Sequence, residues 1–248
     1  MAPLSRLPLH AMETEEARLT NFLSPSALML RLAHRFGYQI HKIPDLGDDS
    51  SANSVDGLVR RAVKLPGMLS AQQGISYYWI GFSQSLQGDI LEIGCWQGRS
   101  TLFLAQACQD SDNGIVHAVD HFRGNPGKTK AYVVGRRDLS DLEDNFRRNI
   151  SEAGLNSFVK VYPVPSSQAS ISADIRLVVI DAEHTRDAVL HDWSVFRHLL
   201  IPGAVAIFDD YSSRDFPGVV QAVNEIHAAE RGSRLAVHGR MASIILPV

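Results

Sequence analysis

The sequence predicts an α/β fold: a mostly parallel, seven-stranded sheet with helices on both faces and an antiparallel hairpin at the C-terminal edge. Three observations lead to this prediction. Residues 89–105 read as an apolar strand that runs into a glycine loop and then opens a helix, and strand and helix patterns alternate from there to residue 230. Two short apolar runs then flank residues 239–241. Because right-handed crossovers return each helix over the strands it joins, the alternation builds a parallel sheet.

The elements follow in order from the spacing of apolar residues. Ser70 and Gln73 match a capping box, and apolar residues at helical spacing follow them, so a helix precedes the first strand. Pro202 and Gly203 are expected to end the helix that follows the fourth strand. The predicted strands are 90–93, 116–119, 158–162, 177–180, 204–208, 234–238 and 243–246, and the helices between them lie near 99–108, 140–153, 186–200 and 218–230.

Composition limits the possible classes of function. The chain has 248 residues, of which 45% are hydrophobic and 21% charged, which suits one α/β domain with an N-terminal extension. A net charge of −3 does not favour a nucleic-acid partner. The two cysteines lack CxxC spacing, and neither a signal peptide nor a membrane-length apolar run is evident. We therefore expect a cytoplasmic protein that binds neither nucleic acid nor membrane.

The chain divides by pattern into two parts. Residues 1–66 are expected to form a helical N-terminal extension, and residues 67–248 the core. Within the extension, residues 44–57 carry four aspartates, no basic residue and several small polar residues. Such a segment cannot bury enough apolar surface to become ordered, so it is predicted to be a mobile loop. Both a lid over the site and plain disorder are compatible with this pattern.

The glycine loop has the residue types of a nucleotide cradle. Gly94 and Gly98 let a ligand approach the main-chain N–H groups, and Asp120, 22 residues after Gly98, stands at the tip of the second strand, where a carboxylate suits a ribose diol. The spacing Glu92-x-Gly94-x-x-x-Gly98 is one residue wider than the dinucleotide fingerprint, and the Glu92 charge would repel a pyrophosphate. A cationic nucleoside without phosphates fits better. Here the sequence resembles class I S-adenosylmethionine (SAM)-dependent methyltransferases.

The resemblance implies SAM as the cofactor and a Rossmann-like core. The stretch 163–167 lacks the acid usual for the adenine amino group, so a serine there or the backbone must replace it. The residues expected to bind SAM lie in the glycine loop, at the tip of the second strand and after the third strand: Glu92, Gly94, Cys95, Trp96, Gly98, Ser100, Asp120, His121, Ser166 and Ser167.

Acidic residues also end the fourth and fifth strands. Asp181 follows one strand, Asp209 and Asp210 follow the other, and such ends converge near the switch point of an open parallel sheet. Three oxygen ligands suit magnesium, calcium or manganese, which lower the pKa of a bound hydroxyl. His184, three residues after Asp181, is the candidate general base. Two alternatives stay open: His184 could be an exposed residue at a helix start, and one of the adjacent aspartates could cap a loop instead of binding metal.

This second group of residues sharpens the resemblance. Asp-x-x-His at 181–184, Leu-Leu-Ile-Pro-Gly-Ala at 199–204 and Phe-Asp-Asp-Tyr at 208–211 are similar to metal-dependent O-methyltransferases that act on sugars of natural products, the macrocin O-methyltransferase group. The likeness spans about residues 69–225. It implies that His184 is the base and that Mg²⁺ or another divalent cation is held by Asp181, Asp209 and Asp210. Ala182 departs from the glycine common at its position.

The expected function is SAM-dependent, divalent-metal-dependent O-methylation of a hydroxyl on a small molecule, such as a sugar or a glycosylated natural product. One alternative is a metal-dependent hydroxylase, because the fold and the acids also resemble a cephalosporin-hydroxylase-like group. Another is a SAM-binding protein without transferase activity. Glu92 and the wide loop disfavour a third, an NAD dehydrogenase. The sequence leaves a homo-oligomer and the identity of the acceptor open.

Overall fold

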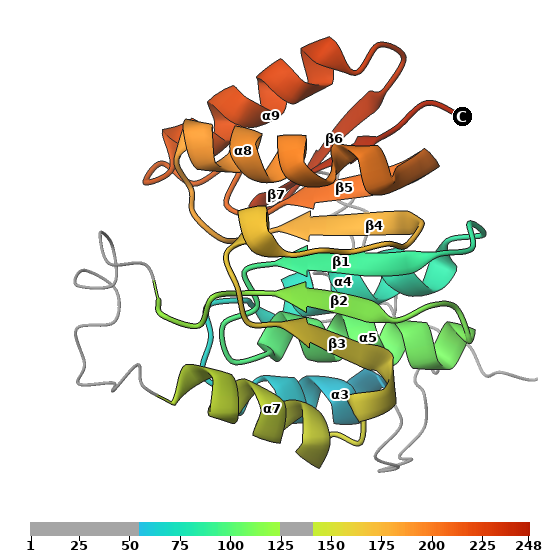
Figure 1. Cartoon of the computed structure of the whole chain (residues 1–248), viewed down its shortest axis with the longest axis vertical. Helices are drawn as coiled ribbons and strands as arrows, with labels where there is room; N and C mark the ends of the chain where they lie inside the picture. Colours follow the sequence, from blue (N-terminus) through green and yellow to red (C-terminus); the bar gives the residue numbers. More distant parts are fainter. Residues whose placement is uncertain (1–54, 125–140) are drawn as a thin grey trace, which may run out of the picture. The chain divides into compact units, whose positions relative to one another are not determined.

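The computed structural model describes residues 55–124 and 141–248. They contain a seven-stranded sheet in the order β3-β2-β1-β4-β5-β7-β6 (Figure 1). Strands β1 to β5 pair in parallel, whereas β7 runs antiparallel to β5 and β6. The predicted sheet and its C-terminal hairpin are confirmed. The strands are β1 Asp89–Ile93, β2 Val116–Val119, β3 Val159–Tyr162, β4 Ile175–Ile180, β5 Leu200–Phe208, β6 Arg234–His238 and β7 Met241–Ile245.

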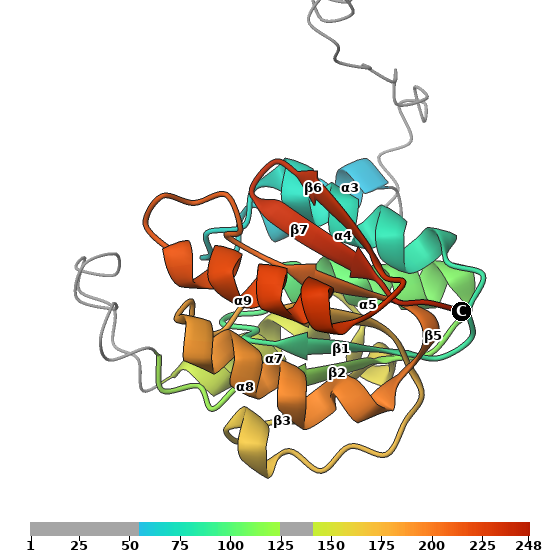
Figure 2. The ribbon, with the colours of Figure 1, turned by 90° about the horizontal axis from the view of Figure 1, so that it is seen from above.

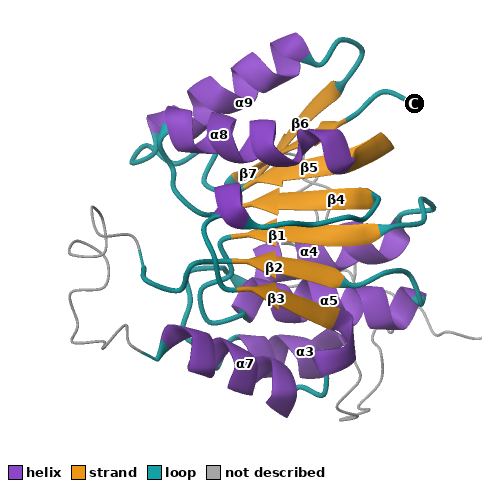
Figure 3. Ribbon diagram, in the orientation of Figure 1, coloured by secondary structure: helices purple, strands orange, loops and turns teal. Residues whose placement is uncertain are grey.

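Helices cover both faces of the sheet, as predicted (Figures 2 and 3). Side chains of α3, α4, α5 and α7 belong to one buried core, and those of α8 and α9 belong to a second core. The helices are α3 Val55–Ala62, α4 Ala71–Ser83, α5 Arg99–Ser111, α7 Leu142–Glu152, α8 Arg186–Phe196 and α9 Pro217–Ala229, with the short 3₁₀ turns η1 Asn156–Phe158, η2 Ser166–Gln168 and η3 Arg197–Leu199.

The central strand β4 shows how the sequence specifies a sheet covered on both sides. All six of its residues are buried, and five of them are apolar, as expected where helices cover both faces. The exception, Arg176, is fully buried and donates hydrogen bonds to the carbonyl oxygens of Gly81, Gly88 and Asn113 at 2.5, 2.8 and 3.0 Å. Its guanidinium therefore joins α4, the start of β1 and the turn after α5 at the amino edge of the sheet.

The segment around Pro202 and Gly203 differs from the prediction. The expected helix 186–200 ends at Phe196, and β5 begins at Leu200, four residues before the predicted start. Both residues lie inside the strand, where the β4–β5 register shifts between the pairs Ile175–Leu200 and Leu177–Val205. Gly203 has φ +78° and donates its N–H to the carbonyl of Pro247. The strand tolerates this proline because an irregular stretch does not need its missing N–H.

Most of the predicted N-terminal extension, including residues 44–54 of the expected mobile loop, lies outside the described residues. Residues 55–57, which that loop also included, instead begin α3, because Leu58 and Ala62 one helical turn apart are fully buried against the core. The division of the chain at residue 67 stays a prediction. Among the described helices, none combines the length and apolar character needed to span a membrane.

Candidate active site

The glycine loop, residues 94–98, joins β1 to α5 at the carboxyl edge of the sheet, beside the switch point between β1 and β4. Gly94 has φ +90°, and a Cβ atom there would lie 2.4 Å from the carbonyl oxygen of Asp181 and 2.7 Å from the Cα of Ala182. Only glycine allows this contact. The predicted cofactor loop and the first predicted metal-binding acid are therefore packed directly against each other.

Asp120 anchors the glycine loop. One of its carboxylate oxygens accepts the backbone N–H groups of Cys95 and Trp96 at 3.0 and 2.9 Å, and the other accepts the N–H of Phe122 at 2.7 Å. These bonds support the left-handed conformation of Trp96, which has φ +50°. A carboxylate offers about four acceptor positions, so one remains after these three bonds. The sequence predicted that Asp120 binds the ribose, but it did not predict that this carboxylate also holds the glycine loop.

Glu92 is fully buried on the face of β1 that α5 covers. Its Oε2 accepts a hydrogen bond from the Thr101 hydroxyl at 2.5 Å, whereas its Oε1 has no hydrogen-bond partner among the described residues. Burial raises the pKa of Glu92 to about 7, against hydrogen bonds from Ser100 and Thr101 that lower it. A positively charged group near Oε1 would offset the cost of this buried charge.

Glu92→Gln is expected to alter the pH dependence of stability in the ligand-free protein. Because the folded pKa of about 7 exceeds the ordinary 4.5, the folded state binds more protons, so wild-type stability falls as pH rises between these values. Glutamine still accepts from Thr101 and carries no charge. The free energy of unfolding of the variant, relative to that of wild type, should therefore rise by about 3 kcal/mol as the pH increases through this range. Urea unfolding at pH 4.5, 6 and 7.5 measures the difference, and a constant difference would contradict the assignment.

The acid cluster, which we define as Asp181, Asp209 and Asp210, follows β4 and β5. His184 lies between two of these acids: its Nε2 is 3.3 Å from Asp181 Oδ1 and 3.5 Å from Asp210 Oδ2. The imidazole stacks on Phe216 with ring centroids 4.4 Å apart, and the side chain is only 14% exposed. The expectation of an exposed helix-start histidine therefore does not hold. Asp210 faces His184 because its own backbone turns, with φ +57°.

Burial and mutual repulsion govern the charges of this cluster. Burial, followed by the charges of Asp181 and Asp210, raises the pKa of Asp209 to about 7. Burial likewise raises the pKa of Asp181, although the hydrogen bond and charge of His184 lower it in part. Burial lowers the pKa of His184, but the adjacent acids outweigh this and the net pKa is raised. Additional positive charge would therefore stabilise the cluster.

Two basic side chains among the described residues already face these acids. The Arg240 guanidinium, from the turn between β6 and β7, contacts Asp210 Oδ1, and His184 faces Asp181 and Asp210. Within residues 55–124 and 141–248, no three His, Cys, Asp or Glu side chains are disposed to hold a metal ion. The oxygen donors therefore suit a divalent cation, but in this arrangement the carboxylates contact Arg240, His184 and Gln73.

The other predicted cofactor residues occupy different environments. Cys95 and Ser100 are buried beside the glycine loop, and burial raises the pKa of the Cys95 thiol. His121, after β2, accepts the Arg123 N–H through Nδ1. Ser166 and Ser167 lie in η2, where Ser166 is hydrogen-bonded to the buried Asp192 of α8 and Ser167 is exposed. The predicted adenine contacts therefore flank α8, on the other side of the sheet from Glu92.

Several polar residues of this region escaped the sequence prediction. Gln73 of α4 donates to Asp209, and Arg99 donates from Nε and Nη1 to the carbonyls of Leu65 and Leu69 at 3.0 and 2.8 Å. Arg99 thereby fixes the chain before α4 to the first turn of α5. The contacts of Gln73 and Arg99 join residues more than 25 positions apart, so no local sequence motif predicts them. Only the capping-box position of Gln73 was visible in the sequence.

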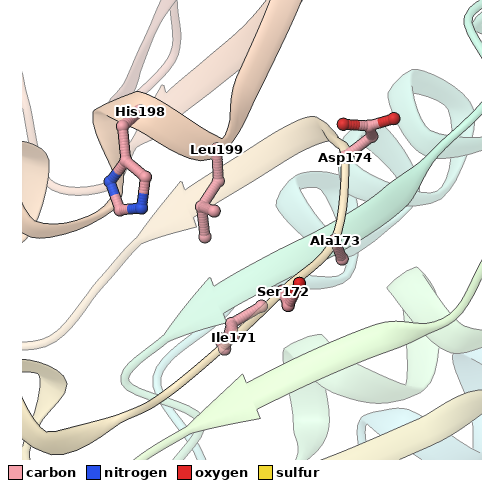
Figure 4. A pocket seen from close by; sticks show the side chains of 6 residues that line it. All are labelled: Ile171, Ser172, Ala173, Asp174, His198 and Leu199. Atoms are coloured by element: carbon pink, nitrogen blue, oxygen red, sulfur yellow. The ribbon is translucent and has the colours of Figure 1, made fainter.

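An open hollow lies at the amino ends of the parallel strands, opposite the acid cluster (Figure 4). It lies before the first residues of β4 and β5, whereas the acid cluster follows their last residues. Its walls carry no grouped ionisable residues apart from Asp174 and His198, so it offers no constellation for catalysis. Its lining residues are Ile171, Ser172, Ala173, Asp174, His198 and Leu199.

Comparison with known proteins identifies the type of domain and the fold. Residues 91–211 match the family model of a methyltransferase domain, a segment that contains both the glycine loop and the acid cluster. Among solved structures, the O-methyltransferase TomG from Streptomyces achromogenes, involved in tomaymycin synthesis and bound to SAM, is similar with a TM-score of 0.51 and 20% identity over 82% of this chain and 92% of that chain. The fold is that of a SAM-dependent methyltransferase.

Two further structures share this methyltransferase fold. An O-methyltransferase from Bacillus cereus in complex with SAH has a TM-score of 0.53 and 21% identity over 81% of this chain and 92% of that chain. The SAH-bound methyltransferase PaMTH1 from Podospora anserina has a TM-score of 0.57 and 16% identity over 99% and 100%. The domain match supports methyl transfer as the class of reaction, and these likenesses show that the fold is shared with O-methyltransferases.

Proposed function

We propose that this protein transfers a methyl group from SAM to a hydroxyl of a small molecule, with the help of a divalent cation, most simply Mg²⁺. The observation that carries the proposal is the packing of Gly94 on the backbone of Asp181 and Ala182. It puts the glycine loop beside the acid cluster. A methyl donor in the loop and an acceptor at the acids would then meet within one site, as an in-line displacement requires.

In this proposal the glycine loop binds SAM. Its backbone approaches the ligand at Gly94 and Gly98, Asp120 offers its remaining acceptor position to the ribose, and the buried Glu92 supplies negative charge toward a cationic ligand. The carboxylates of Glu92, Asp120 and Asp181 lie near the loop and would repel a pyrophosphate. Cys95, Trp96, Ser100, His121, Ser166 and Ser167 complete the proposed set of cofactor contacts.

The acid cluster is the proposed cation site. Its three carboxylates have the oxygen donors that Mg²⁺ takes. Burial raises the pKa values of Asp181 and Asp209, so a bound cation would stabilise their charged forms. When bound, the cation would lower the pKa of the acceptor hydroxyl. Before it binds, Arg240 must leave Asp210 and His184 must turn away from Asp181. His184 would then accept the hydroxyl proton as general base.

The proposed acceptor is a hydroxyl on a sugar or a glycosylated natural product. Support comes from the resemblance of Asp181-x-x-His184 and Asp209-Asp210 to the macrocin O-methyltransferase group. Glu92 and the three aspartates of the acid cluster disfavour anionic acceptors such as phosphorylated sugars, which would face repulsion at close range.

Calorimetry of SAM and of NAD, each with and without Mg²⁺, tests the proposal together with a turnover assay. We expect SAM but not NAD to bind, and SAH to form with at least one acceptor among catechols, phenolic acids and methyl glycosides in the presence of Mg²⁺. Binding of SAM without turnover would leave a SAM-binding protein. A requirement for iron and dioxygen would indicate a hydroxylase, and turnover that is unchanged by EDTA would remove the cation from the proposal.

His184→Ala is expected to lower kcat by roughly 10²- to 10⁴-fold, the usual contribution of a general base. Because a general base must be unprotonated, the wild-type rate should increase with pH through the pKa of His184, and the variant should lose this limb. Affinities for SAM and Mg²⁺ should change little. His191→Ala removes an exposed histidine from α8 and serves as the control. An unchanged pH–rate profile in His184→Ala would exclude it as the base.

A further inference from the structure

Helix α4 covers the acids of the site. Side chains alternate along a strand, and Ile90, Val179 and Ile207 all belong to the core that α4 and α5 share. Glu92, Asp181 and Asp209 lie two residues beyond these three, so they project to the same face of the sheet. The end of β5 lies beside the first turn of α4, the helix that precedes β1 in the chain, because Gln73 of that turn contacts Asp209.

Gln73, in the first turn of α4, makes a direct contact with this group of acids. Its Nε2 donates a hydrogen bond to Asp209 Oδ1 at 2.9 Å, joining residues 136 apart in sequence. The orientation of the amide is determined by its other end, because Oε1 accepts from the Ser70 backbone N–H at 3.1 Å and from the Ser70 hydroxyl at 2.8 Å. With Oε1 engaged by two donors, the amide NH₂ must face Asp209.

The next turn of α4 continues this wall. Tyr77, four residues after Gln73 and on the same helix face, is fully buried, and its hydroxyl has no hydrogen-bond partner among the described residues. Burial, followed by the charges of Asp209, Asp181 and Glu92, raises the pKa of Tyr77. This face of α4 therefore lies close to Glu92, Asp181 and Asp209, in addition to packing on the sheet.

We propose that Gln73 is a positioning residue for Asp209, an inference that rests on the proposed methyl transfer. Its amide holds Oδ1 of Asp209, whose carboxylate also accepts a backbone hydrogen bond from Asp210, and so fixes the direction in which this acid faces a ligand at the acid cluster. Asp209 is only 8% exposed, so few groups could orient it from solvent. The same glutamine thus has two functions: its carbonyl oxygen completes the N-terminal cap of α4, and its amide nitrogen orients an acid of the site.

Gln73→Glu separates the two functions. Glutamate satisfies a capping box as well as glutamine does and suits a helix N-terminus, so α4 should keep its cap. It cannot donate to Asp209 and places a second carboxylate against it. Gln72→Glu is the matched control, because it makes the same change one position earlier, at an exposed residue of the same turn. Both variants should stay folded at the assay temperature, and Gln73→Glu should unfold at a somewhat lower temperature than Gln72→Glu because its carboxylate is repelled by Asp209.

The assay uses the full chain, SAM, Mg²⁺ and the best acceptor found in the panel. We expect kcat to fall roughly tenfold to a hundredfold in Gln73→Glu, the factor that one hydrogen bond to a charged group contributes, with the Kd for SAM within about twofold of wild type. Gln72→Glu should keep wild-type kcat. In NMR spectra of the ligand-free protein, the Gln73 side-chain amide signals, assigned by their loss in Gln73→Glu, should shift in Asp209→Asn.

Unshifted amide signals would overturn the Gln73–Asp209 contact, and wild-type kcat in Gln73→Glu would overturn its positioning role. Equal losses of kcat in the two glutamate variants would also overturn it, because added charge alone would then explain the effect. Absence of transfer by the wild-type enzyme would refute the proposed function and this inference with it. Normal wild-type transfer together with normal Gln73→Glu transfer refutes the inference alone.

Discussion

Asp181→Ala is expected to abolish Mg²⁺-supported methyl transfer, with a loss of about a thousandfold or more, while SAM binds with nearly wild-type affinity. The carboxylate of Asp181 faces His184 at 3.3 Å, so its loss removes both a proposed cation ligand and the partner of the proposed base. The backbone contacts of this residue survive in alanine. They include the hydrogen bond from its N–H to the Ile93 carbonyl at 2.9 Å and the packing on Gly94.

The measurements for this variant are single-turnover SAH formation and calorimetric titration with SAM. Asp174→Ala is a suitable control, because Asp174 is an exposed aspartate just before the other end of the same strand, beside the hollow in Figure 4. It should leave transfer unchanged. If Asp181→Ala loses SAM affinity and transfer to the same degree, the residue supports the loop. If it retains transfer, the acid cluster has no part in the reaction.

Gly94→Ala is expected to cause the largest loss of stability, about 4 kcal/mol, and to prevent SAM binding. The new methyl group would meet the Asp181 carbonyl oxygen at 2.4 Å in a backbone conformation, φ +90°, that alanine disfavours. The atoms it meets belong to the backbone, so relief requires β1 and β4 to separate at the proposed cofactor site.

Gly98→Ala provides the comparison for this effect. Gly98 has a similar φ of +86°, but the nearest atoms that a Cβ there would meet belong to the side chains of Phe146 and Ile150, at 3.2 Å or more. These side chains can shift, so the expected loss is about 1 to 2 kcal/mol, the cost of the backbone conformation alone. Urea unfolding of both variants measures the difference. Equal losses would show that strain in φ, and not the contact with Asp181, makes Gly94 necessary.

The sequence predicted elements whose signals are local. Periodicity located the strands that end at Ile93, Val119, Ile180 and Phe208, because burial on both faces requires continuous apolar runs. The hairpin after α9 was predicted in the same way. The start of β5 was wrong, since Pro202 and Gly203 mark a helix end by local rules, whereas pairing with β4 keeps them in an irregular strand.

The candidate site was predicted less completely than the fold. Residue types and spacing indicated Glu92, Asp120, Asp181, His184 and the aspartates after β5, because the carboxyl ends of parallel strands converge. Which hydrogen bonds those residues make was not predictable. Asp120 holds the glycine loop through three backbone N–H groups, and Asp209 receives Gln73 from a helix 136 positions earlier.

Local patterns were therefore enough to predict the succession of strands and helices along the chain, the glycine loop and the acids at the strand ends. These features depend on the spacing of neighbouring residues and on the handedness of crossovers. Three features depend on tertiary packing: Gly94 rests on the backbone of Asp181, α4 supplies a donor to Asp209, and His184 and Arg240 face the acid cluster. The reason is physical: these contacts join distant segments, and their geometry depends on how the packed elements meet.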